Sequence, residues 1–343
     1  MNAISSTMAL MPRESAKFIA HRAKNVFIEE GGVKNLAYTV LEGLKSRKVS
    51  VNNFSQIEVH PSPEDPKAVD WIFVLDTLNY SFWSETDAPK WTVNGQTGYF
   101  ALCAAIKRAI EEGKPIVDPK YYSQITRSEA ERIFRGDSEA SIPLLDERVK
   151  SLRETGRILL EKYQGSFVNC IKSCSRSTEQ LLKCIVRDFE SYRDEATYEN
   201  QRVSFYKRVQ ILIGDIWACF KGQGIGEFED IDHITMFADY RIPQVLVHFG
   251  AIRYNNTLLS RLQSDIELEN GSEDEIEIRG CSIEVVERVK DEVRDLIERY
   301  PNLALKKSDI NAVLIDHFLW DYRREHAEEL ERIPFHKTRC IYY

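Results

Sequence analysis

The sequence predicts a mainly helical fold with a minor β-sheet. Apolar residues recur at helical spacing along most of the 343 residues, helix start and stop signals flank many of these segments, and strand-like runs are few. Apolar residues make up 43% of the chain and charged residues 29%, which is ordinary for a globular protein with a sizeable core. We expect a single compact domain over residues 11–343, preceded by a disordered tail of residues 1–10.

The helices are predicted in chain order from their boundary residues. A first helix begins at Pro12 and is expected to end at Gly31-Gly32, and a second continues through residues 36–44. A capping box, Thr126 to Glu129, opens a later one. The predicted helices after residue 44, including that one, span residues 99–112, 126–134, 144–163, 177–189, 204–220 and 310–322.

Strand candidates are short and scattered. They are Val69–Leu75, which follows a proline-rich linker at His60–Pro66, and the runs Trp91–Val93 and Glu275–Ile278. The acidic stretch Glu267–Glu275 is best interpreted as a solvated surface loop. The β content should therefore be small.

Net charge and cysteine content restrict the class of protein. The net charge of −8 disfavours stable binding to nucleic acid through many phosphates, so a small molecule is the expected partner. Seven cysteines, an odd number, lie mostly in apolar helical patterns and indicate a reducing compartment. No window approaches a membrane span. We expect a cytoplasmic protein, and the sequence gives no basis for a particular oligomeric state.

Two motifs that suggest cofactors have simpler explanations. Gly222-Gln-Gly-Ile-Gly226 follows a predicted helix, whereas a nucleotide-binding loop follows a strand, so these glycines indicate a helix stop. Cys170 and Cys174 lack the second pair of a zinc site, and no histidines have the His-Glu-x-x-His spacing. Neither a metal nor another cofactor is expected.

Aspartates within apolar segments are the main functional signal. Asp239 interrupts one apolar run, and Asp316 and Asp321 interrupt another. A carboxylate is rarely buried alone, so each of them is either paired within the fold or used at a site. On an ideal helix Asp316 and Asp321 point roughly 140° apart, while Asp321 can pair with His317. In a purely structural alternative, Asp321 pairs with His317 and Asp316 accepts bonds from a neighbouring loop.

Two further segments offer groups for a planar, anionic ligand. The aromatic residues of Asn79–Ser84 could stack on a heterocycle or simply pack over the sheet. Lys207 and Arg208 stand at the start of a strongly apolar helix. Lys207 could bind a phosphate, or it could solvate the helix surface.

Six motifs together resemble the queuosine salvage protein family. They are Pro12–Ser15, Leu78–Ser84, Arg202–Arg208, Ile234–Gln244, Ile278–Cys281 and Ile333–Tyr343. The resemblance extends from about residue 11 to the last residue. It implies a helical fold like that of DNA glycosylases and hydrolysis of queuosine 5′-monophosphate to queuine and ribose 5-phosphate, which returns the base to tRNA modification.

The resemblance also implies the site residues. Asp316 would be the catalytic carboxylate. The queuine site would be lined by Phe237, Asp239, His317 and Asp321. The family often has tyrosine directly after the catalytic aspartate, whereas this chain has His317.

Hydrolysis of this nucleotide would require several carboxylates around the base and the sugar, and one cationic side chain for the phosphate. Breaking an N-glycosidic bond passes through an oxocarbenium-like state that a nearby carboxylate stabilises, and a 7-deazaguanine lacks the N7 that is usually protonated. We expect Asp316 to face the ribose C1′ and Asp239 to accept N–H groups of the base edge. Asp321 would meet the cationic amine or the diol of queuine. Lys207 or Arg241 would meet the 5′-phosphate.

Two other functions stay open at this point. The first is a nucleic-acid glycosylase, which the net acidity disfavours. The second is a non-catalytic helical adaptor or queuine-binding protein in tRNA modification. An adaptor would need none of the three aspartates.

Overall fold

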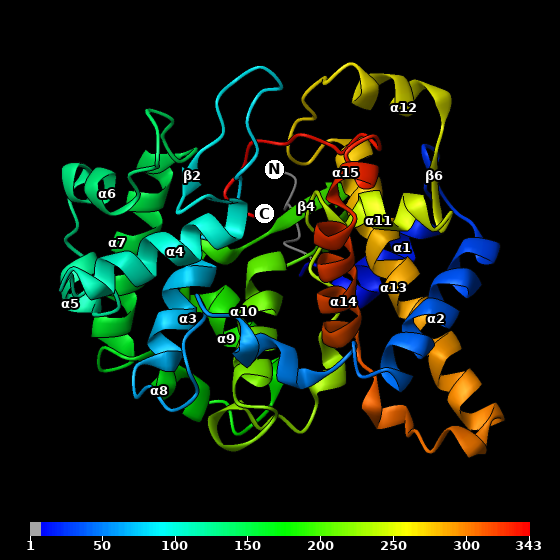
Figure 1. Cartoon of the computed structure of the whole chain (residues 1–343), viewed down its shortest axis with the longest axis horizontal. Coiled ribbons are helices and arrows are strands. Elements are labelled where there is room, and N and C mark those ends of the chain that lie inside the picture. The colour runs from blue at the N-terminus through cyan, green and yellow to red at the C-terminus, as the bar shows by residue number, and fades with distance from the viewer. Residues whose placement is uncertain (1–7) are drawn as a thin grey trace, which may run out of the picture. The chain divides into compact units, whose positions relative to one another are not determined.

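The chain divides into two units in the computed structural model, which describes residues 8–343 (Figure 1). The first unit comprises the chain up to Ser50, Asp194–Lys207 and Thr235–Arg339. The second comprises Val51–Arg193, Arg208–Ile234 and Cys340–Tyr343. A single domain over residues 11–343 stays a prediction. Of the expected tail, residues 1–7 lie outside the described residues, while the Leu10 N–H donates to the Arg202 carbonyl at 3.0 Å.

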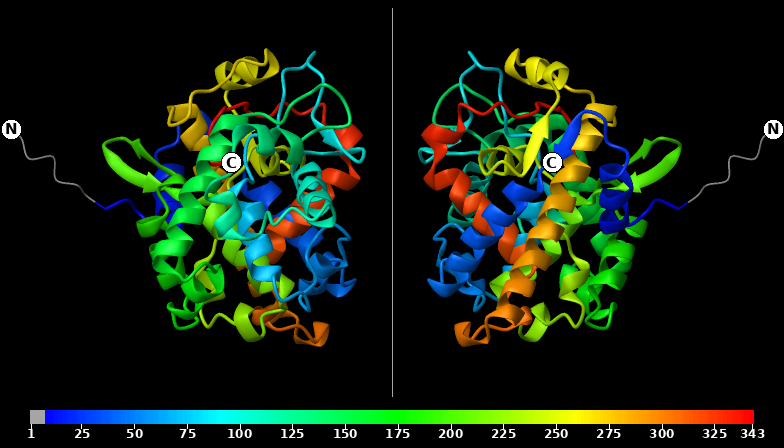
Figure 2. Two further views of the ribbon diagram at one scale, coloured as in Figure 1. Left: turned by 90° about the vertical axis from the view of Figure 1, so that its left-hand side faces the viewer. Right: turned by 90° about the vertical axis from the view of Figure 1, so that its right-hand side faces the viewer.

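The first unit is built around one long helix, α13 (Glu273–Arg299). Its other helices and strands are α1 (Pro12–Ala20), β1 (Val26–Ile28), α2 (Glu30–Lys45), β4 (Glu195–Tyr198), β5 (Gln201–Ser204), α11 (Ile242–His248), β6 (Ile252–Tyr254), α12 (Asn256–Gln263), α14 (Ala312–Glu325) and α15 (Ala327–Leu330). Helices α1, α2, α11 and α14 all contact α13. Figure 2 shows α13 as the long orange helix with α1 and α2, in blue, beside it.

The sequence of α13 explains both its start and its packing. Acidic residues fill its first turn, where the positive end of the helix dipole favours them. At Gly280 an added Cβ would lie 2.7 Å from two carbon atoms of Ile19. Glycine at this position therefore allows α1 to approach α13 closely.

The second unit is also helical. Its helices and strands are α3 (Ala68–Thr77), β2 (Thr92–Val93), β3 (Gln96–Thr97), α4 (Gly98–Glu111), α5 (Pro119–Tyr122), α6 (Arg127–Ile133), α7 (Leu145–Lys162), α8 (Phe167–Lys172), α9 (Thr178–Asp188) and α10 (Lys207–Cys219), of which only Lys207 belongs to the first unit. The strands of the described residues pair into antiparallel two-stranded sheets, β1 with β6, β2 with β3, and β4 with β5.

The predicted mainly helical fold with little sheet is confirmed. Helices α4, α6, α7 and α9 occupy the predicted segments, and the capping box of Thr126 and Glu129 is formed. Gly222 has a φ of +69° and its N–H donates to the Trp217 carbonyl at 2.8 Å, so it does end α10. The likeness to DNA glycosylases stays a prediction.

Several sequence-based assignments are wrong. Val69–Leu75 lies in α3 rather than in a strand, because most side chains of this helix are buried and no polar face marks the helical period. Glu275–Ile278 belongs to the first turns of α13. The pair Gly31-Gly32 lies inside α2; a Cβ on Gly32 would come within 2.0 Å of the Gly250 carbonyl oxygen, so packing explains this glycine.

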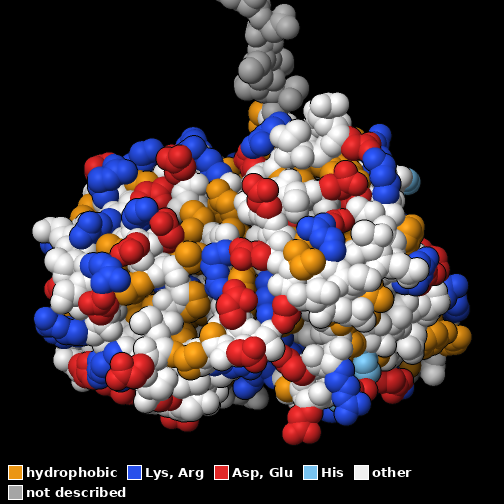
Figure 3. All heavy atoms as spheres, turned by 90° about the horizontal axis from the view of Figure 1, so that it is seen from above, with side chains coloured by type: hydrophobic (Ala, Val, Ile, Leu, Met, Phe, Trp, Pro, Cys, Tyr) orange, Lys and Arg blue, Asp and Glu red, His pale blue; other side chains and the backbone are white. Residues whose placement is uncertain are grey.

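The surface and the cysteines bear on the expected environment. On the face seen in Figure 3, acidic and basic side chains are interspersed. All seven cysteines are buried free thiols. Across residues 8–343 no helix has the length and apolar character needed to cross a membrane.

Candidate functional site

All six predicted site residues belong to the first unit. They come from the start of α10, from the loop that precedes α11, and from α14: Lys207, Phe237, Asp239, Asp316, His317 and Asp321. Helices α11 and α14 contact each other directly, so the loop and the helix are neighbours within one unit. The structure thus brings together Phe237 and Asp316, which lie 79 residues apart in the sequence.

Asp316 is hydrogen-bonded to the backbone of the loop that precedes α11. Its Oδ2 accepts a hydrogen bond of 2.9 Å from the Phe237 N–H, and only 5% of the residue is exposed. The Asn311 side chain caps the first turn of α14 by accepting from the Leu314 N–H at 2.9 Å, which fixes where the helix begins. The cap and the loop together set the orientation of the Asp316 carboxylate.

One carboxylate oxygen of Asp239 accepts hydrogen bonds within the fold, and the other accepts none from the described residues. Oδ1 accepts from the N–H groups of Arg241 and Ile242, at 3.0 and 2.9 Å, and so satisfies donors at the start of α11. No described residue donates a hydrogen bond to Oδ2. Burial raises the pKa of Asp239, while the Lys207 ammonium and the two backbone N–H groups act in the opposite direction.

Asp321 is half-buried and makes no hydrogen bond or ion pair with any described residue. Burial raises its pKa, and the charges of His317 and Arg324 oppose that shift. The direct pair with His317 that the sequence suggested is therefore not formed, since their side chains interact only at longer range. The His317 ring lies 6.2 Å from the Phe237 ring, centroid to centroid.

Lys207 is 5% exposed and begins α10. Its backbone N–H donates to Asp194 Oδ2 at 3.0 Å, so a carboxylate accepts a hydrogen bond from the start of the helix. Tyr206, just before it, has a φ of +48°, in the left-handed region that a bulky residue seldom occupies. The Tyr206 hydroxyl donates to Glu195 Oε1 at 2.6 Å, which holds this turn in place.

Sequence reasoning missed the buried ion pair of Arg279 and Asp194. Arg279 donates from Nη1 and Nη2 to the two oxygens of Asp194, at 2.8 and 2.7 Å, and from Nε to the Ala238 carbonyl at 2.9 Å. One signal could have revealed it: Arg279 falls between Ile276 and Ile283 at helical spacing, so a charged residue stands on the apolar face of α13. That position required a buried partner.

The aromatic segment Asn79–Ser84 lies in the second unit. Arg148 donates to the carbonyls of Leu78 and Tyr80, and its guanidinium lies 4.4 Å from the centre of the Tyr80 ring. Arg208 also lies near this ring, at 5.1 Å. Tyr80 is 1% exposed, which favours the structural interpretation for this residue over stacking on a ligand.

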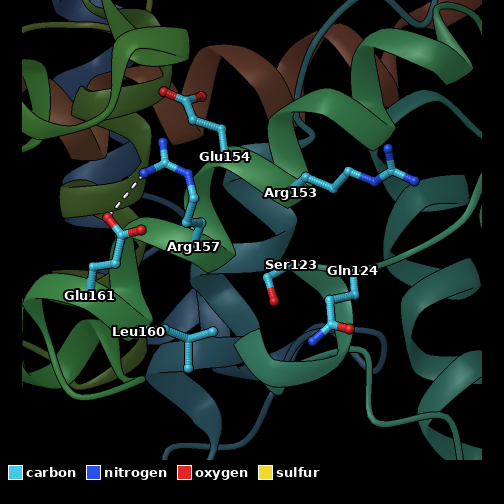
Figure 4. Close-up of a pocket in the computed structure, with 7 residues that line it drawn as sticks. All are labelled: Ser123, Gln124, Arg153, Glu154, Arg157, Leu160 and Glu161. Carbon is cyan, nitrogen blue, oxygen red and sulfur yellow. Dashed lines mark hydrogen bonds and ion pairs between the residues drawn. The ribbon is translucent and has the colours of Figure 1, made fainter.

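A pocket of about 570 Å³ in the second unit contains none of the predicted site residues (Figure 4). Its charged groups already serve the fold. Arg157 pairs with Glu161 at 3.0 Å, Arg153 donates to the Ile125 carbonyl at 2.7 Å, and Glu154 accepts from the Ser191 N–H. The pocket therefore offers no argument for a ligand.

The chain is similar to one family of known proteins over most of its length. A family model described as Queuosine salvage protein matches residues 59–343. A Bos taurus protein named queuosine 5′-phosphate N-glycosylase/hydrolase is 48% identical over 339 residues, covering 97% of this chain and 99% of the relative. Relatives of the same name from Mus musculus and Schizosaccharomyces pombe are 46% and 34% identical, covering 97% and 96% of this chain and 99% of each relative.

Proposed function

This chain belongs to the queuosine salvage protein family, and from that premise we propose that it hydrolyses the N-glycosidic bond of queuosine 5′-monophosphate. The products are queuine, which returns to tRNA modification, and ribose 5-phosphate. Identity over nearly the whole length of relatives named for this activity is the observation that carries the proposal. The buried carboxylate of Asp316 is consistent with it.

Asp316 is the catalytic residue of this proposal. Its carboxylate stabilises the positive charge that develops at C1′ as the bond to the base breaks. The Phe237 N–H keeps that carboxylate in one orientation, so no reorganisation is needed in the transition state. Because the base is a 7-deazaguanine without N7, stabilisation on the sugar side carries more of the catalysis.

The Phe237 ring and four polar side chains bind the substrate in this proposal. Asp239 accepts one N–H of the base edge through Oδ2, since Oδ1 is already used by the backbone. Asp321 meets the cationic aminomethyl group, because a half-buried carboxylate with no hydrogen bond from the described residues is suited to a charged donor. His317 lies beside Phe237, and Lys207 supplies the cation for the 5′-phosphate.

We further propose that the substrate is free nucleotide rather than tRNA and that the protein is cytoplasmic. The net charge of −8 and the interspersed charges in Figure 3 support the first point. Seven free thiols support the second. No metal or other cofactor is required by the proposed reaction.

The test is mass spectrometry of the base released from queuosine 5′-monophosphate. We expect wild-type protein to release queuine and Asp316→Asn to lose at least 10²-fold in kcat, since it removes the charge that stabilises the transition state. Asp291→Asn, at an exposed position on α13, is the matched control and should retain activity.

Three outcomes would each contradict part of the proposal. Folded wild-type protein that is stabilised thermally by the nucleotide but releases no queuine would be a binding protein. Equal rates in wild type and Asp316→Asn would move the catalytic role to another group. An electrophoretic shift with tRNA would favour a nucleic-acid substrate instead.

A further inference from the structure

One buried guanidinium connects two parts of the candidate site, the loop with Phe237 and Asp239 and the start of α10. Through Nε, Arg279 holds the carbonyl of Ala238, which stands between Phe237 and Asp239. Through Nη1 and Nη2, it holds both oxygens of Asp194. Asp194 Oδ2 in turn accepts the N–H of Lys207 at 3.0 Å. The segment with Asp239 and the start of α10 are thus fixed to the same side chain.

The geometry favours a rigid connection. Arg279 and Asp194 are 1% and 3% exposed, and the bidentate pair is the arrangement that fixes both distance and orientation. Glu275 Oε1, one turn earlier on α13, lies 3.5 Å from Arg279 Nη1, and the guanidinium lies 4.3 Å from the centre of the Phe205 ring. Such surroundings leave the side chain little freedom to follow a displaced loop.

The link through Arg279 matters because the charge of Lys207 affects the pKa of Asp239. The Lys207 ammonium is the largest single influence that lowers the pKa of Asp239 against the effect of burial. Arg241 and Arg323 are the other charged groups that act on Asp239. Both are held independently of Arg279, since Arg241 Nη1 and Arg323 Nε donate to Gln244 Oε1 at 3.2 and 2.8 Å.

We propose that Arg279 and Asp194 are positioning residues that set the placement of Lys207 relative to Asp239, an inference that rests on the proposed function of these two groups. Neither member of the pair touches substrate. Their effect is to keep the cation for the phosphate and the carboxylate for the base at a fixed separation. A displacement of about 1 Å at such groups can cost about 10²-fold in rate.

Arg279→Lys tests the connection, because lysine keeps the positive charge but cannot form the bidentate pair. We expect kcat/KM for queuosine 5′-monophosphate to fall about 10²-fold. With Lys207 displaced, the pKa of Asp239 should rise further, so the acidic limb of the kcat/KM profile should move to higher pH. The preference for nucleotide over nucleoside should also weaken, because the same ammonium serves the phosphate.

Asp194→Asn is the second variant, and it keeps the shape of the side chain and an acceptor for the Lys207 N–H. The same direction of change is expected in all three readouts. Glu287→Gln is the matched control: Glu287 is also buried on α13, where it pairs with Arg13 at 2.8 Å and Lys290 at 2.6 Å. This control should melt at a lower temperature yet keep the wild-type pH profile and nucleotide preference.

The outcomes separate this inference from the proposed function. If wild-type protein releases queuine while the Arg279 and Asp194 variants keep its pH profile and nucleotide preference, the positioning role is wrong and the function stands. If Glu287→Gln shifts the profile equally, the effect is general destabilisation and the inference also fails. Absence of queuine release by the wild type would reject the proposed function itself.

Discussion

At the scale of single residues, the three aspartates differ in the partners that the fold gives them. Asp316 accepts a backbone N–H, Asp239 uses one oxygen to start α11, and Asp321 has no hydrogen bond from the described residues. A carboxylate that loses water without gaining a donor is costly, so Asp321 is the one whose partner should come from outside the chain.

That difference predicts a selective effect of Asp321→Asn. Queuine carries the cationic amine and 7-deazaguanine does not, so the variant should weaken inhibition by queuine about tenfold or more and leave inhibition by 7-deazaguanine unchanged. Competitive inhibition constants for the two bases, measured with wild type and variant, provide the comparison. Equal losses for both bases would show that Asp321 does not recognise the amine.

The sequence could identify these aspartates but not all of the residues that hold them. A carboxylate in an apolar run stands out wherever it occurs, and recognition of the family supplied the roles. The pair of Arg279 and Asp194 was missed because its members lie 85 positions apart. Asp321 was expected to pair with His317 from helical spacing alone, yet Asp321 forms no hydrogen bond or ion pair with any described residue.

At the scale of elements, α1 packs closely against α13 at Gly280. A Cβ there would meet Ile19 Cδ1 and Cγ2 at 2.7 Å and Cβ at 2.8 Å, and the last of these cannot move away by rotation of the side chain. The packing of α1 on α13 therefore depends on the missing side chain. The family motif Ile278–Cys281 thus includes a glycine with a structural reason.

We predict that Gly280→Ala lowers the free energy of unfolding by about 1–2 kcal/mol, because overpacking outweighs the gain in helix propensity. Gly31→Ala is the matched control: Gly31 lies in α2 with nothing within 4 Å of the added Cβ, and this change should be neutral or stabilising by up to about 1 kcal/mol. Urea unfolding of both variants measures the difference. A Gly280→Ala protein as stable as wild type would show that α1 adjusts freely.

The sequence predicted helices correctly where capping residues mark the ends of the helix. The capping box of α6 and the glycine after α10 were sufficient, because these interactions involve residues close in sequence. The prediction failed where a helix is buried on nearly all sides, because no polar face then reveals the helical spacing of its apolar residues. Helix α3 is rich in β-branched and aromatic residues, and only tertiary packing makes it a helix.

At the scale of the whole molecule, both units are assembled from separate stretches. The boundaries fall at Ser50, Arg193, Lys207, Ile234 and Arg339. Composition shows no break at these positions, since contacts rather than linkers define the units. Neither unit corresponds to one continuous fragment, which is why residue patterns along the chain could not reveal the division.

Stability of the whole chain should depend on pH through His336. Burial, and secondarily the charge of Arg279, lowers the pKa of this histidine from 6.5 to about 3, and the residue is 1% exposed. In the unfolded chain the imidazole takes up a proton below pH 6.5, whereas in the folded chain it stays neutral. Its contribution is therefore fully present above pH 6.5 and is lost as the pH falls towards 3.

The size of the effect makes it measurable. One pH unit between the two pKa values corresponds to about 1.4 kcal/mol, so lowering the pH from 6.5 to 5 should cost about 2 kcal/mol of unfolding free energy through His336 alone. His336→Gln should flatten the pH dependence by that amount, even if it lowers stability at pH 7. Urea unfolding at several pH values measures this, with His21→Gln, at an exposed position, as the control for losing one histidine. Parallel curves for wild type and His336→Gln would mean that the pKa of His336 is the same in the folded and the unfolded chain.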